Sequence, residues 1–177
     1  MGKKKVVIPL SILIILLAFF AVFAHTFVFN VFSGRVHFPE EYIGVNLKME
    51  DGKIFKVLRR LQVEGEYDTS DENAVFKVRF KFKSLKFKTN KRLSMIPAPF
   101  LMGMRGFREK YWTFNEEIDY FQGIYQWESK EDAEDYPNSF IYKLMTKRAE
   151  KGTLLYEIIP DTDLTEYIDK LLSDLKR

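Results

Sequence analysis

The longest hydrophobic run of the chain lies near its start. From Val6 to Gly34 there is no Asp, Glu, Lys or Arg, and most residues are Ile, Leu, Val, Phe or Ala. About 20 apolar residues are needed to cross a hydrocarbon layer of roughly 30 Å, and every backbone amide must be bonded inside that layer. The pattern therefore predicts a single transmembrane helix over residues 6–28, within an anchor segment 1–34, and the lipid bilayer as a partner.

Three lysines, Lys3, Lys4 and Lys5, precede this run. The positive-inside rule then places the N-terminus in the cytoplasm and everything after Arg35 outside the cell membrane. A cleaved signal peptide is the competing interpretation. It is less favoured because the run exceeds the usual core of about 7–15 residues and continues through Phe27–Phe29.

Residues 35–73 form a connecting segment with two readings. Val45, Leu47 and Met49 alternate with polar residues before Asp51-Gly52. This pattern favours a hairpin, because Asp-Gly between apolar runs is a hairpin signal. Residues 53–61 also fit an amphipathic helix.

A main domain is predicted over residues 74–177, where the periodicity sharpens. Apolar residues at 76, 78, 80 and 82 alternate with cations, which predicts a strand with one apolar and one cationic face. Further strands are expected at 107–114, 120–128 and 154–159, with a helical turn at 90–95. A helix begins after Ser129, is interrupted at Pro137 and stops before Gly152, and a last helix follows Thr162 or Asp163.

The resulting order, β-α-β-β-α-β plus a terminal helix, is the α+β ferredoxin-like arrangement. An antiparallel sheet of this kind is expected to carry its helices on one face. The other face would then meet water, a ligand or a second copy.

The residues available for catalysis are few. There is no cysteine, and the two histidines, His25 and His37, both precede the main domain. Thiolate chemistry, histidine bases and histidine-ligated metal or haem are thereby excluded from that domain. We expect no metal and no cofactor, and no catalytic motif stands out.

Charge is unevenly distributed along the chain. No acidic residue occurs between Ala74 and Arg108, whereas this stretch contains ten basic residues. A solvated edge strand would explain this pattern, and so would an anionic partner such as lipid headgroups near the anchor. Nucleic acid is not expected, because no binding motif is present. The candidate contacts to an anionic surface are Lys77, Arg79, Lys81 and Lys83.

Aromatic residues at 111, 112, 125 and 127 lie on adjacent predicted strands. They fit plain core packing, and they also fit an aromatic-lined cavity for an apolar ligand such as a quinone, polyketide or lipid.

Three segments resemble a known family. They are Gly106–Thr113 (GFREKYWT), Gln122–Trp127 (QGIYQW) followed by Asp132-Ala133, and Tyr156–Pro160 (YEIIP). Over about residues 74–160 the chain resembles the dimeric α+β barrel superfamily, and within it the small mono-oxygenase-like branch. The resemblance implies a homodimer whose two sheets face each other and enclose a cavity. The candidate cavity residues are Arg108, Lys110, Tyr111, Trp112, Tyr125 and Trp127.

Three functions follow as hypotheses. The first is a membrane-anchored domain that binds a small apolar or amphiphilic ligand in a dimeric barrel cavity, without catalysis. The second, which the resemblance implies, is a cofactor-independent mono-oxygenase-like enzyme for an aromatic or lipid-like substrate, in which Lys110 or Arg108 holds an anionic oxygen. The third is a structural dimerisation domain with a filled barrel.

Overall fold

The computed structural model describes residues 32–65 and 73–175 continuously, and isolated positions between 9 and 29. The predicted membrane helix over residues 6–28 falls mainly on residues outside this description. Among the residues that are described, no helix combines the length and the apolar character that crossing a membrane requires.

A single antiparallel sheet forms the centre of the domain. Four of its strands follow each other in the order β7-β4-β6-β5. This is the order expected for the predicted β-α-β-β-α-β chain, so the ferredoxin-like fold is confirmed. These strands are β4 (Ala74–Phe80), β5 (Phe107–Asn115), β6 (Tyr120–Trp127) and β7 (Leu155–Pro160).

The domain boundary predicted at residue 73 falls inside this sheet, because strands before and after that residue pair with each other. β3 (Ile54–Val63) pairs with β5 along its length, and so extends the sheet beyond the four central strands. β2 (Asn46–Lys48) turns back onto β3 as a hairpin around Asp51-Gly52, and β1 (Val36–His37) pairs with the other end of β3. Residues 36–63 therefore belong to the sheet and do not only connect the anchor segment to the main domain.

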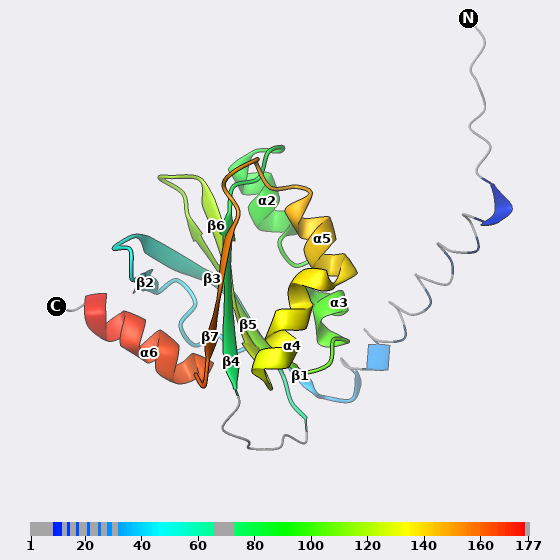
Figure 1. Ribbon diagram of the computed structural model, residues 1–177, viewed down its shortest axis with the longest axis horizontal. Helices are drawn as coiled ribbons and strands as arrows, with labels where there is room; N and C mark the ends of the chain where they lie inside the picture. The colour runs from blue at the N-terminus through cyan, green and yellow to red at the C-terminus, as the bar shows by residue number, and fades with distance from the viewer. Residues whose placement is uncertain are drawn as a thin grey trace, which may run out of the picture.

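Short helices cover one face of the sheet (Figure 1). They are α2 (Phe87–Leu93), α3 (Ala98–Met102), α4 (Lys130–Asp135), the 3₁₀ turn η1 (Tyr136–Asn138) and α5 (Phe140–Thr146). Ser129 caps α4 by accepting from the amide of Asp132, as the sequence predicts. Pro137 interrupts the helical stretch, and Ser139 caps its continuation.

The opposite face is covered as well, contrary to the expectation that helices lie on one side only. α6 (Leu164–Leu175) lies there beside β2, so that the sheet stands between α6 and the other helices (Figure 1). Leu164, Ile168 and Leu171 pack with Val75 and Ile124 of the sheet in a second hydrophobic core. An amphipathic helix gains its stability from burying its apolar stripe, and this face of the sheet provides the surface.

The position of α6 bears on the homodimer that the resemblance implies. Two copies could not enclose a barrel between these sheet faces unless α6 moved away from each. The homodimer itself stays a prediction.

The cationic face of β4 is also covered. Lys77 is buried and donates hydrogen bonds to Glu50 (2.9 Å) and to the Tyr167 hydroxyl (3.1 Å). Arg79 pairs with Asp51 at 2.6 Å and lies over the Phe55 ring. Lys77 and Arg79 are two of the four residues proposed to contact an anionic surface, and both form ion pairs within the chain. Lys83 remains exposed.

Candidate ligand-binding cavity

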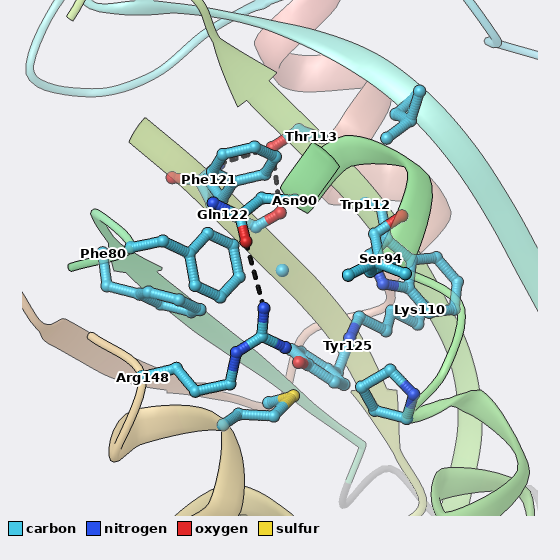
Figure 2. Close-up of a pocket in the computed structure, with 16 residues that line it drawn as sticks. Phe80, Asn90, Ser94, Lys110, Trp112, Thr113, Phe121, Gln122, Tyr125 and Arg148 are labelled. Atoms are coloured by element: carbon cyan, nitrogen blue, oxygen red, sulfur yellow. Dashed lines mark hydrogen bonds between the residues drawn. The ribbon is translucent and has the colours of Figure 1, made fainter. Parts of the chain in front are cut away.

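A cavity of about 50 Å³ lies between the sheet and the helices α2 and α5 (Figure 2). It sits within one protomer, on the face opposite α6, and not between two sheets as the resemblance implies. No Asp or Glu lines it. The lining residues are Leu58, Phe80, Phe82, Asn90, Leu93, Ser94, Pro97, Lys110, Trp112, Thr113, Phe121, Gln122, Gly123, Tyr125, Met145 and Arg148.

Gly123 of β6 is one of the residues that make room for the cavity. A Cβ atom at this position would lie 2.6 Å from Cε2 of Tyr125, because the Tyr125 ring folds over the glycine. Tyr125 is itself 1% exposed, so its ring could not move aside freely. The glycine therefore allows the ring to lie flat beside the cavity.

Lys110 is the most unusual residue of the lining. Its side chain leaves β5 toward the cavity, and only 2% of the residue is exposed. The ammonium nitrogen lies 4.3 Å from the centre of the Trp112 ring and 4.4 Å from that of Tyr125. Within residues 32–65 and 73–175, no carboxylate forms an ion pair with it. Two aromatic faces therefore provide its electrostatic stabilisation.

Burial lowers the pKa of Lys110 well below its ordinary value of 10.5. Lys77, on the other face of the sheet, shows the contrast. Burial alone would lower its pKa too, but the hydrogen bonds to Glu50 and Tyr167 outweigh that effect and raise it. The Lys110 ammonium is thus removed from water, and no carboxylate of the described residues offsets the lost hydration.

A second polar group faces the cavity from the helical side. Arg148 donates a hydrogen bond to Oδ1 of Asn90 at 3.0 Å (Figure 2). Asn90 is buried and donates to the carbonyl oxygens of Ser84 (3.1 Å) and Leu85 (3.3 Å). Asn90 therefore ties α2 to the preceding loop and to the segment after α5. Sequence reasoning missed both residues, because they are 58 positions apart and neither belongs to a motif.

The structure divides the six predicted cavity residues into two groups. Lys110, Trp112 and Tyr125 line the cavity together. The other three lie elsewhere: Arg108 is ion-paired with Glu128, Tyr111 packs on the α6 face, and Trp127 is fully buried against Tyr136.

The volume limits what the cavity can hold in this conformation. A buried water needs about 10–15 Å³ of such space, whereas pockets for drug-sized ligands measure about 300–1,000 Å³. The cavity therefore has room for a few water molecules or a very small solute. A quinone or polyketide is too large for the cavity in this conformation. Among the described residues, no group of carboxylates and histidines could hold a metal ion.

No protein-family model and no curated protein matches the chain. Several solved structures are similar to it, and three of them are described below. A ferredoxin-fold protein from Listeria monocytogenes, related to antibiotic-biosynthesis monooxygenases, is 12% identical with a TM-score of 0.48, over 66% of this chain and 69% of its own. A major regulator of staphylococcal pathogenesis is 7% identical with a TM-score of 0.49, over 65% and 72%.

The third is a heme-degrading enzyme from Listeria monocytogenes, which is 16% identical with a TM-score of 0.46, over 62% of this chain and 72% of its own. The first of these proteins is of the kind that the sequence resemblance names. At these identities the similarity concerns the fold, which here is ferredoxin-like by its strand order.

Proposed function

We propose that the domain binds a very small ligand with an apolar part and an oxygen acceptor, in the cavity beside Lys110. The observation that carries this proposal is a buried lysine without a carboxylate partner among the described residues, held between Trp112 and Tyr125. A Met or Leu at this position would fill the same space without the desolvation cost. A ligand oxygen that accepts from the amine would offset that cost and explain the residue.

The rest of the lining fits the same ligand. The apolar walls favour an apolar body, and Arg148 adds a second donor on the helical side. Burial of the ligand would strengthen its hydrogen bond to Lys110, because the surroundings have a low dielectric constant.

The test is mass spectrometry of small molecules that co-purify with the full-length, detergent-extracted protein. We expect a bound compound in the wild type and its loss in the Lys110→Met variant, with retention in Lys147→Met, which changes an exposed lysine beyond α5. Equal recovery from wild type and Lys110→Met would contradict the proposal. The same samples, given the identified compound in an oxygen electrode, test the mono-oxygenase alternative by Lys110-dependent oxygen uptake.

We also propose that residues 6–28 anchor the domain in the cell membrane, with the N-terminus in the cytoplasm. The apolar run in the sequence supports this, and so do the exposed side chains of Leu10, Ile14, Leu17 and Val28. The expected result is that the chain stays in the membrane pellet after alkaline carbonate extraction and is released by detergent. Recovery in the supernatant without detergent would contradict the anchor.

A further inference from the structure

A second hollow, separate from the Lys110 cavity, lies between β3 and the outer side of α2. Its volume is about 500 Å³, and its lining consists of four cations and one threonine: Arg59, Lys88, Thr89, Lys91 and Arg92. No acidic residue contributes to it. The hollow therefore concentrates positive charge in a concave surface of ligand size.

A β-bulge brings Arg59 into this hollow. The register of β3 against β5 shifts between Val57, which is opposite Thr113, and Arg59, which is opposite Trp112. In a regular strand, residues two apart point to the same face, so Arg59 would follow Val57 into the core beneath α6. The extra residue reverses this and directs Arg59 to the face that carries α2.

The charges of the hollow are not explained by local stability. Lys88, Lys91 and Arg92 are spaced i, i+3 and i+4 on α2, where like charges repel. The helix dipole favours cations in the last turn, which accounts for Lys91 and Arg92 but for neither Lys88 nor Arg59. No ion pair joins any of the four to a described carboxylate. Lys91 is held in place, with its ammonium 4.1 Å from the centre of the Phe114 ring.

We propose that this hollow binds the phosphate group of a phosphorylated ligand. Two guanidinium groups offer planar, bidentate donors to phosphate oxygens, and the two ammonium groups add charge that matches a phosphate dianion. The hydroxyl of Thr89 is a further donor of the right kind. A phospholipid headgroup and a soluble phosphate compound share this chemistry.

The test is calorimetric titration of the full chain in a neutral detergent at low salt. The two probes are inorganic pyrophosphate and water-soluble dihexanoylphosphatidic acid. We expect Arg59→Gln and Lys91→Gln each to weaken binding about tenfold to a hundredfold, the range for one charged hydrogen-bonding partner. Lys143→Gln and Lys147→Gln, which change exposed cations at α5, should leave binding unchanged.

Both sources of phosphate are distinguished by the same titrations. Tighter binding of the lipid assigns a headgroup, and equal binding of both probes assigns a soluble phosphate compound; either supports the proposal. No binding of either probe, or an equal loss in the α5 variants, would overturn it. So would tighter binding of a short single-stranded oligonucleotide. Thermal melts check folding, and the exposed Arg92→Gln replaces any variant that does not fold.

Discussion

Replacing Lys110 by Met is expected to stabilise the folded domain at neutral pH, by on the order of 2 kcal/mol. Met has a similar length and fills the same space between Trp112 and Tyr125, but it has no amine to desolvate. A functional residue that costs stability is expected to behave in this way when it is replaced. Denaturant unfolding of both full-length proteins in the same detergent would measure the difference.

The pH dependence of this difference gives a sharper result. Because burial lowers the pKa of Lys110, the folded chain binds fewer protons at this site than the unfolded chain, between the lowered pKa and the ordinary value of 10.5. The free energy of unfolding of the wild type should therefore rise with pH across that window, and the Met variant should lack this contribution. The stabilisation by Met should shrink as pH approaches 10.5.

The controls for this experiment lie in the same chain. Burial raises the pKa of Tyr125, which acts on stability in the opposite direction above pH 10, so the two proteins are compared below pH 10. Lys147→Met removes an exposed lysine and should change neither stability nor its pH dependence. If Lys110→Met were less stable than the wild type across the whole window, the amine would have a stabilising partner and the proposed site would lose its basis.

The alternation of apolar and polar residues was sufficient to predict the central strands. β5 and β6 begin at their predicted residues, and the shared face of Lys110 and Trp112 follows from their spacing of two. Tyr125 joins them because it is the register partner of Lys110 on the neighbouring strand. The positions of Lys110, Trp112 and Tyr125 at the cavity could therefore be predicted from the pattern and the strand order.

Other features of the fold depend on contacts that no local pattern encodes. The apolar stripe of α6 is plain in the sequence, but a stripe does not say which face of a sheet it covers. Its place beside β2 brings Tyr167 and Glu50 to Lys77, which is why the cationic face of β4 is buried. The β3 bulge escaped prediction for a similar reason, since it shows only in the pairing with β5.

Trp127 shows that a residue on the same face of the sheet as the cavity residues can still belong to the hydrophobic core. It shares a face with Tyr125, two residues earlier on β6, and the sequence leaves both open to core packing or to a place in the cavity. Its register partner is Phe107, whose ring lies 5.7 Å away, and Tyr136 covers it at 5.2 Å. It is 0% exposed, so its indole belongs to the hydrophobic core and not to the cavity lining.

Trp127→Ala is therefore expected to lower the free energy of unfolding by about 3–5 kcal/mol, because the removed ring leaves a void that the rigid surroundings cannot fill. Since single domains are stable by only about 5–15 kcal/mol, much of the protein should be lost to aggregation or proteolysis. Trp112→Ala, at the cavity, should cost less and should remove the bound compound from folded protein. Urea unfolding with parallel mass spectrometry measures both effects. If Trp127→Ala kept the stability of the wild type but lost the ligand, the binding site would lie near η1 and not beside Lys110. That result would contradict the proposed function.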